Sequence, residues 1–157
     1  MKYTDILIGF REVPDEISLC INISNCPYKC KNCHSPQLQS DIGKELNIQE
    51  LKNIINNNKQ NDFTCICLMG GDADILSIND LGKVIHSLGY KSCWYSGKEY
   101  ISEEIDYRNF DYIKYGPYVE EKGPLDNPNT NQRMIKIINY NDGILESEDI
   151  TYKFYRK

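Results

Sequence analysis

The segment from Phe63 to Met69 limits the possible folds of this chain more than any other feature. It reads Phe-Thr-Cys-Ile-Cys-Leu-Met, a nearly continuous apolar run. Such runs are typical of strands that are buried on both faces, as in parallel sheets whose connecting helices cover them. The run ends at Gly70-Gly71-Asp72, which predicts a turn directly after the strand. The segment therefore favours an α/β fold.

Apolar runs and helical patterns alternate along the first 115 residues. Strands are predicted at residues 6–10, 18–23, 63–69, 92–95 and 110–115. The capping box Asn47-x-x-Glu50 predicts a helix to about residue 58, and Ser77-x-x-Asp80 predicts a second helix that ends before the cap glycine Gly89. A further helix is predicted over 99–106. Strands that alternate with helices indicate parallel βαβ units.

The length of 157 residues fits one domain, which we expect to span residues 1–157. A complete eight-fold barrel takes about 250 residues, so we expect an incomplete, open barrel or a small open sheet. Residues 116–130 contain three prolines and two glycines and are predicted to be mostly loop. Residues 134–139 and 144–154 flank Asn141-Asp142-Gly143, which predicts a C-terminal β-hairpin without an evident catalytic role.

Charge and hydropathy exclude two classes of partner. The formal net charge is −5 and no basic block is present, which argues against a nucleic-acid partner. No run approaches the roughly 20 apolar residues of a spanning helix, and the polar start at Met1–Asp5 is unlike a signal peptide. We therefore expect a cytoplasmic protein with no membrane partner.

Seven cysteines are many for such a chain, and their odd number argues against a disulfide framework. Three of them form the motif Cys26-x3-Cys30-x2-Cys33, which puts three thiols on one loop where they can converge on one metal centre. A four-iron cluster normally takes one protein ligand per iron. Three ligands leave one iron open to a small chelating molecule, and an open position is typical of a catalytic metal site.

Other interpretations of the motif remain open. Zinc could be completed by His34 or by a distant cysteine, although structural zinc sites usually show two separated ligand pairs and His34 directly follows Cys33. The loop could also hold no metal. A four-cysteine ferredoxin fits poorly because the fourth ligand has no obvious candidate.

Residues outside the motif receive structural interpretations. Cys65, Cys67 and Cys93 lie in apolar strands and are predicted to be small buried hydrophobes. Cys20 is given no role. Trp94 is predicted to lie in the core, and His86 on the surface.

The cysteine loop resembles the cluster loop of radical S-adenosylmethionine enzymes. Met69-Gly70-Gly71-Asp72 is similar to the Gly-Gly-acid motif of that superfamily. The small size, Tyr95-Ser96-Gly97 and Asn131-Gln132-Arg133 resemble one branch, the activating proteins of anaerobic (class III) ribonucleoside-triphosphate reductases. The resemblance covers about residues 18–136. Ala73 after the acidic residue and Asn25 before the first cysteine depart from the usual proline and glycine.

The resemblance implies a truncated, open partial (βα) barrel of the radical S-adenosylmethionine type with a C-terminal β-hairpin. It implies a [4Fe–4S] cluster on Cys26, Cys30 and Cys33, whose open iron is chelated by S-adenosyl-L-methionine. It assigns cofactor binding to Gly70, Gly71 and Asp72. Ser96 and Gly97 lie at the end of the next predicted strand, at the edge where parallel α/β folds place ligands, so they are predicted either to contact the cofactor or to form a plain strand-to-helix turn. No side chain is assigned a catalytic role, because the cofactor carries the chemistry.

The resemblance also implies an activity and partners. An activating oxidoreductase of this kind cleaves S-adenosylmethionine reductively, and the 5′-deoxyadenosyl radical creates a glycyl radical on the large subunit of the anaerobic ribonucleotide reductase. An electron donor such as reduced flavodoxin is implied. The alternatives are a radical enzyme for another glycyl-radical protein or a small molecule, and a zinc-stabilised binding module without catalysis.

Overall fold

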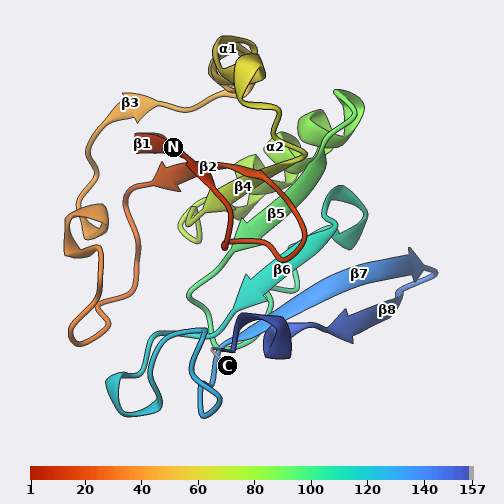
Figure 1. Cartoon of the computed structure of the whole chain (residues 1–157). Coiled ribbons are helices and arrows are strands. Elements are labelled where there is room, and N and C mark those ends of the chain that lie inside the picture. Colours follow the sequence, from red (N-terminus) through yellow and green to blue (C-terminus); the bar gives the residue numbers. More distant parts are fainter. Residues whose placement is uncertain (156–157) are drawn as a thin grey trace.

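The computed structural model describes residues 1–155, which form one eight-stranded sheet and two α-helices (Figure 1). The strands are β1 (Lys2–Gly9), β2 (Ser18–Ile23), β3 (Lys44–Glu45), β4 (Cys65–Met69), β5 (Lys91–Tyr95), β6 (Tyr112–Tyr115), β7 (Arg133–Asn141) and β8 (Ile144–Asp149). Their order in the sheet is β3-β1-β2-β4-β5-β6-β7-β8. The pairs β2–β4, β4–β5 and β5–β6 are parallel, and all other pairs are antiparallel.

The predicted central strands are confirmed with small shifts of their ends. β2 has the predicted bounds, whereas β1 starts four residues earlier than predicted. β3 was not predicted, because its two residues are too few to show the alternation of apolar and polar side chains that marks a strand. The mixed α/β class is confirmed, and the comparison with a partial barrel stays a prediction.

The two α-helices begin at side-chain caps. α1 (Ile48–Asn58) follows the predicted cap Asn47, whose side chain accepts a hydrogen bond from the Glu50 backbone N–H. α2 (Ile75–Ser87) begins two residues before the predicted Ser77, because Asp74 is the cap and accepts from the Ser77 backbone N–H at 3.2 Å. Among residues 1–155, no helix has both the length and the apolar character that a membrane span requires.

The helix predicted over 99–106 is wrong. The only helical turn near this segment is the 3₁₀ turn Tyr107–Asn109. Asn79 on α2 explains the difference, because its side chain donates to the Glu104 carbonyl and accepts from the Asp106 N–H, both at 2.8 Å. These backbone groups are thereby satisfied without a helix.

The C-terminal hairpin is confirmed, with a shorter second strand. Asp142 and Gly143, both at positive φ, connect β7 to β8. β8 ends at Asp149 and the chain turns into the 3₁₀ helix Thr151–Phe154. Asp149 causes this turn, because its carboxylate accepts from both the N–H and the hydroxyl of Thr151.

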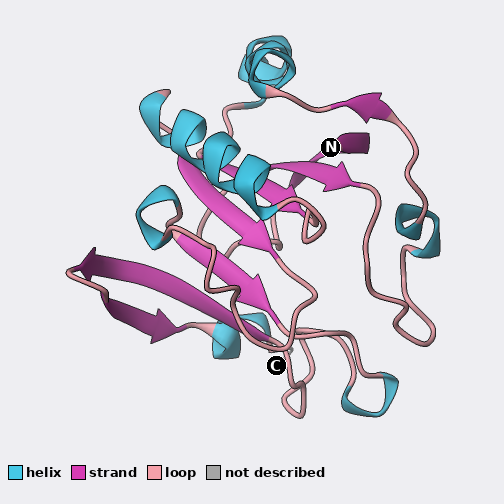
Figure 2. Cartoon of the chain, turned by 180° about the vertical axis from the view of Figure 1, so that it is seen from behind, coloured by secondary structure: helices cyan, strands magenta, loops and turns pink. Residues whose placement is uncertain are grey.

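The two faces of the sheet differ in their packing. α1 and α2 lie on one face (Figure 2), where Leu19, Ile66, Leu68 and Trp94 belong to the main core. On the opposite, open face, Cys20, Cys65, Cys67 and Cys93 form a smaller core with Tyr112 and Met134. Side chains alternate between the faces along each strand, so each strand contributes to both cores.

Candidate functional site

The carboxyl ends of the four parallel strands meet at one edge of the sheet. The cysteine loop follows β2, Gly70–Asp72 follows β4, Ser96–Gly97 follows β5, and Gly116 follows β6. Ligands in open α/β sheets bind outside this edge. Segments that are far apart in the sequence are therefore brought together where a ligand site is expected.

Two glycines form the turn after β4. Gly70 and Gly71 have φ values of 109° and 91°, a region that side chains rarely adopt. A Cβ atom on Gly70 would lie 2.9 Å from the Ile23 carbonyl oxygen, and one on Gly71 would lie 2.5 Å from the Ile78 Cδ1. The Trp94 indole N–H donates to the Gly70 carbonyl at 2.9 Å. This turn thus requires glycine at both positions.

Asp72 connects the turn after β4 to the turn after β5. Its Oδ1 accepts a hydrogen bond from the Ser96 hydroxyl, and its Oδ2 accepts from the Gly97 backbone N–H at 3.1 Å. Burial raises the pKa of the Asp72 carboxyl in spite of these hydrogen bonds. Asp72, Ser96 and Gly97, which the sequence assigns to one cofactor site, therefore lie in direct contact.

The three loop cysteines are free and partly exposed. The backbone around them is ordered by hydrogen bonds, from the Cys26 N–H to the Leu38 carbonyl at 2.9 Å and from the Cys33 N–H to the Cys30 carbonyl at 3.3 Å. The Ser35 N–H donates to the Cys33 sulfur at 3.4 Å. Hydrogen bonds of this type stabilise thiolate ligands and tune iron–sulfur clusters.

The loop thiols are not arranged as a preformed metal cage. Within residues 1–155, no group of three or more His, Cys, Asp or Glu side chains is placed to hold a metal ion. The donor set nevertheless fits an iron–sulfur cluster, because three accessible thiols lie on one short loop and one sulfur already accepts a backbone N–H. The assignment of the cluster to these cysteines stays a prediction.

Tyr28 packs the cysteine loop onto the turn after β5. A Cβ atom on Gly97 would lie 2.7 Å from the Tyr28 ring, so the ring occupies the space that this glycine leaves. The Cys26 thiol donates to the Tyr28 carbonyl at 3.8 Å. Burial raises the pKa of the Tyr28 hydroxyl to about 12, and the Asp72 charge adds to this effect. Sequence analysis had not assigned Tyr28, because a loop tyrosine carries no signal of its partner.

Lys114 is a second residue that the sequence analysis missed. Its side chain is 8% exposed on the open face of β6, opposite Tyr95 of β5. Its ammonium donates to the Ser96 carbonyl at 3.3 Å and to the Gly116 carbonyl at 2.8 Å. The signal that could have found it is a lysine at an inward position of an otherwise apolar strand.

Asn131, Gln132 and Arg133 support the loop after β6. The Asn131 amide donates to the Pro117 carbonyl at 2.9 Å, and the Arg133 guanidinium donates to the carbonyls of Thr130 and Gln132, both at 2.8 Å. The buried Asn131 Oδ1 has no hydrogen-bond partner within residues 1–155. These contacts order the chain that leads into β7.

The loop after β6 in turn contacts the cysteine loop. The Asn32 amide donates to Glu120 at 2.6 Å, and Lys31 forms an ion pair with the same carboxylate at 3.3 Å. His34 lies edge-on to Tyr118 with 5.1 Å between ring centroids. The cysteine loop is thus held from two sides, by the strand ends and by the chain after β6.

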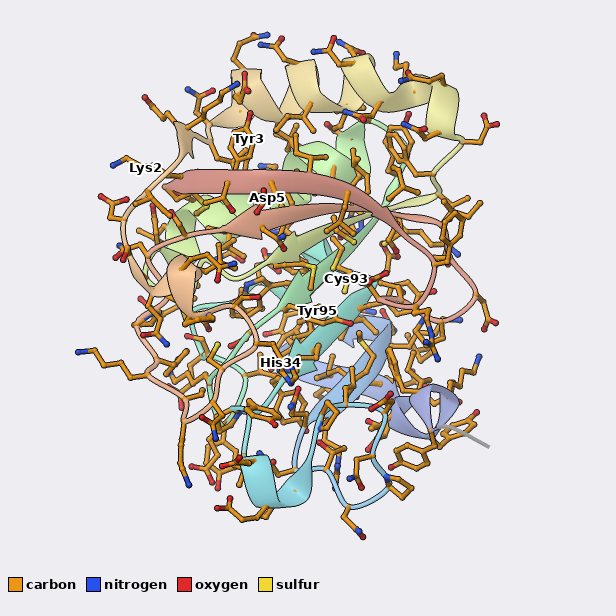
Figure 3. The ribbon with its side chains drawn as sticks, turned by 60° about the vertical axis from the view of Figure 1, so that its left-hand side comes forward. Lys2, Tyr3, Asp5, His34, Cys93 and Tyr95 are labelled. Atoms are coloured by element: carbon orange, nitrogen blue, oxygen red, sulfur yellow. The ribbon has the colours of Figure 1, made fainter. Side chains whose placement is uncertain are left out.

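A cleft of about 1050 Å³ lies on the open face of the sheet. Met69, Tyr95 and His34 line it, together with residues 10–12, 14–15, 124–126 and 153–155. Figure 3 shows Cys93, Tyr95 and His34 following one another along this side of the molecule. The cleft therefore leads from the core of the open face to the residue that follows Cys33.

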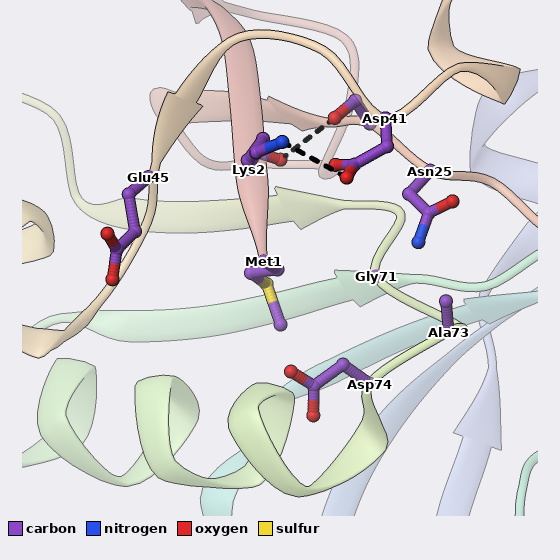
Figure 4. A pocket seen from close by; sticks show the side chains of 9 residues that line it. Met1, Lys2, Asn25, Asp41, Glu45, Gly71, Ala73 and Asp74 are labelled. Atoms are coloured by element: carbon purple, nitrogen blue, oxygen red, sulfur yellow. Dashed lines mark hydrogen bonds and ion pairs between the residues drawn. The ribbon is translucent and has the colours of Figure 1, made fainter.

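A smaller cavity of about 480 Å³ lies on the other side of the Gly70–Asp72 turn (Figure 4). Gly71, Asn25 and Ala73 line it, beside the ion pair between Lys2 and Asp41 at 3.0 Å. The turn after β4 therefore borders this cavity at Gly71, whereas the larger cleft is bordered by Met69 at the end of β4.

The remaining sequence assignments divide into confirmed and corrected ones. Cys65, Cys67, Cys93 and Trp94 are fully buried, as predicted, and His34 is exposed. His86 is not a simple surface residue, since its Nε2 lies 2.7 Å from the Asp111 carboxylate and 3.1 Å from the Ser92 hydroxyl. A position off the apolar face of a helix does not reveal a polar partner in a following strand.

Comparison with known protein families identifies the family of the chain. Residues 15–113, more than half of the chain, match a family model described as a 4Fe-4S single cluster domain. The matched segment contains the cysteine loop, the Gly70–Asp72 turn and the Ser96–Gly97 turn. No curated protein and no solved structure matches the chain.

Proposed function

The chain belongs to the family of 4Fe-4S single cluster domains, and we propose that it is a radical S-adenosylmethionine activating enzyme. In this proposal Cys26, Cys30 and Cys33 hold the cluster, and the product is a glycyl radical on the large subunit of an anaerobic ribonucleotide reductase. Family membership makes the chain an iron–sulfur protein; the cofactor and the substrate are our inference.

One observation carries the proposal: the cysteine loop, the glycine turn and the Ser96–Gly97 turn form a single contact network. Asp72 binds both Ser96 and Gly97, and Gly97 packs against Tyr28, which lies between two of the cysteines. A domain that only transfers electrons needs no such contact network beside its cluster. A domain that holds a three-ligand cluster next to a cofactor does need one, because the cofactor must be positioned against the open iron.

The chain's own residues would position the cofactor. The glycine turn places the Gly71 backbone at the edge of the cavity of about 480 Å³, where the amino-acid part of a ligand would approach. The Asp72 carboxylate holds two turns in register and supplies negative charge near the ligand's amino group. The Ser96–Gly97 turn and the Tyr28 ring limit the site on the side of β5 and help to exclude water.

A bound, reduced cluster would supply one electron to the sulfonium of S-adenosylmethionine, which splits into methionine and a 5′-deoxyadenosyl radical that abstracts hydrogen from a glycine Cα. The chain must therefore admit a polypeptide to the site. The cleft of about 1050 Å³ on the open face is the proposed route, because His34, which follows Cys33, and Met69, which precedes Gly70, both line it.

The proposal is tested with anaerobically purified, cluster-loaded protein. We expect S-adenosylmethionine to perturb the visible spectrum and a reductant to produce 5′-deoxyadenosine. Addition of an anaerobic ribonucleotide reductase should give the electron paramagnetic resonance doublet of a glycyl radical. A reductase variant with alanine at the radical glycine is the matched control and should give no doublet.

Other outcomes would assign other functions. A cluster that does not respond to S-adenosylmethionine would make the chain an electron-transfer or structural iron–sulfur domain. Deoxyadenosine without a glycyl radical would indicate another protein or a small molecule as the substrate. Zinc in place of iron after anaerobic purification would contradict the proposal.

A further inference from the structure

Lys114 carries a positive charge in a place where a charge is costly. Its side chain is 8% exposed, and its ammonium lies 5.9 Å from the centroid of the Tyr95 ring. The hydrogen-bond partners are two neutral carbonyls, of Ser96 and Gly116. None of the ion pairs found within residues 1–155 includes Lys114. A buried ammonium without a direct counter-ion is unfavourable in isolation.

The ammonium lies beneath the network that supports the cysteine loop. Ser96 accepts from Lys114 through its carbonyl and donates to Asp72 through its hydroxyl. The next residue, Gly97, packs against Tyr28 of the cysteine loop. A chain of direct contacts therefore joins Lys114 to the segment between Cys26 and Cys30.

The charges around Lys114 are consistent with this placement. Burial lowers the pKa of the ammonium to about 8, whereas the charges of Asp72, Cys30 and Cys26 act in the opposite direction. Asp72 thus supplies part of the negative charge that favours the ammonium, and a cluster on the cysteine loop would add to it.

We infer that the Lys114 ammonium is the buried counter-charge of the cluster and that it makes the cluster easier to reduce. One-electron reduction adds one negative charge to the cluster and its thiolates, without forming or breaking a bond. A fixed positive charge nearby in a poorly solvated site stabilises the reduced state more than the oxidised state. Lys114 thus acts only by holding a positive charge in place, and it touches no reacting atom. The inference rests on the proposed assignment of the cluster to Cys26, Cys30 and Cys33.

The test is a redox titration of the loaded full-length chain with dithionite, followed by electron paramagnetic resonance. Lys114→Met keeps the apolar stem and removes the charge. We expect iron and sulfide content to be retained and the equilibrium constant for reduction to fall at least tenfold, which is a drop of about 59 mV for a one-electron couple. Lys114→Arg should stay within threefold of the wild type.

Lys98→Met is the matched control, because Lys98 directly follows the Ser96–Gly97 turn and its charge also acts on Asp72, but the residue is exposed. Its effect should be small and should vanish at high salt, whereas that of Lys114→Met should persist. If Lys114→Met does not fold, Lys114→Gln provides the same test with a neutral donor to the carbonyls.

Two results overturn the inference. One is a loaded Lys114→Met or Lys114→Gln protein with the wild-type potential, and the other is an equal shift in Lys114→Arg. A cluster that survives in Cys26→Ala would instead overturn the assignment of the ligands, so the two failures are distinguishable.

Discussion

Two polar networks lie at opposite ends of the same parallel strands, and their electrostatics differ. At the amino ends, the Glu16 carboxylate accepts hydrogen bonds from Lys91, from the Thr64 hydroxyl at 2.6 Å and from the Tyr112 hydroxyl at 2.9 Å. Burial alone would raise the pKa of the Glu16 carboxyl, but these hydrogen bonds hold it below its usual value. The ionised form of Glu16 therefore stabilises the folded chain.

The network at the carboxyl ends shows the opposite balance. Burial raises the pKa of Asp72 in spite of two hydrogen bonds, and burial lowers the pKa of Lys114 to about 8. Both shifts mean that the folded chain disfavours the charged form of the group. Strongly perturbed pKa values cluster at functional sites. The comparison separates a network whose charge stabilises the fold from one whose charges the fold disfavours, which is the balance expected at the proposed cofactor site.

The largest expected effect is at the carboxyl ends. Cys30→Ala removes one of three proposed ligands, and we expect iron and sulfide to fall from about four per chain to nearly none. The unfolding free energy of the metal-free protein should change by less than about 0.5 kcal/mol, because Cys30 lies on a partly exposed loop. Metal analysis and urea unfolding measure the two effects.

Cys93→Ala is the matched control for Cys30→Ala. Cys93 is fully buried in β5, away from the loop, so this variant should keep its iron and lose some stability. Loss of the cluster in Cys93→Ala, or its retention in Cys30→Ala, would show that the three loop cysteines are not the ligand set.

At the amino ends the expected effect is on stability alone. Glu16→Gln removes the charge that Lys91, Thr64 and Tyr112 bind, and should lower the unfolding free energy by about 2 kcal/mol. The wild-type contribution is present above the unfolded pKa of about 4.3 and is lost as the pH falls through the lower folded pKa. Urea unfolding at pH 7 and at pH 4 should show this difference shrinking in acid.

The control for Glu16→Gln is Glu103→Gln, an exposed position that should change the unfolding free energy by less than about 0.5 kcal/mol. A loss of iron in Glu16→Gln would break the comparison, since it would give the amino-end network a part in the cluster site.

The sequence predicts the strands better than it predicts the polar networks. β2, β4 and β5 are apolar runs between turn residues, and such local patterns survive folding because they are buried. The helix predicted over 99–106 failed because Asn79 binds the backbone of that segment. A contact between residues that are 25 or more positions apart leaves no pattern in the local sequence.

The same reason separates the predicted part of the candidate site from the part that was missed. Asp72 could be named from its resemblance to the Gly-Gly-acid motif, and Ser96 and Gly97 because turns at the ends of parallel strands must lie at one edge. Tyr28 and Lys114 could not, because their roles depend on a neighbour on another strand or loop. Glu16 and His86 were missed in the same way, since their partners lie in segments far away in the sequence.

Asp72→Asn should sharpen the comparison with Glu16. Because the folded pKa of Asp72 is raised, its carboxylate lowers stability once the pH exceeds both the unfolded and the folded pKa. The neutral amide removes this penalty, so the unfolding free energy at pH 7 should rise, by less than the loss expected for Glu16→Gln. The spectral response to S-adenosylmethionine should be lost. A variant less stable than the wild type at pH 7 would place Asp72 with the stabilising network.

The smallest expected effect is that of His86, a second ion-pairing group at the amino ends. The hydrogen bond to Asp111 raises the pKa of His86, while burial opposes the shift. The charged imidazole therefore contributes stability that is complete below the unfolded pKa of about 6.5 and is lost as the pH rises through the raised folded pKa. His86 and Asp111 are 32% and 36% exposed, so solvent screens the pair and we expect a few tenths of a kcal/mol. In urea, the unfolding free energies of the wild type and of His86→Gln should differ at pH 6 and become equal at pH 8.5. A difference that instead increases with pH would show that the fold favours neutral His86. His86 would then resemble Asp72 and Lys114, whose charged forms the fold disfavours.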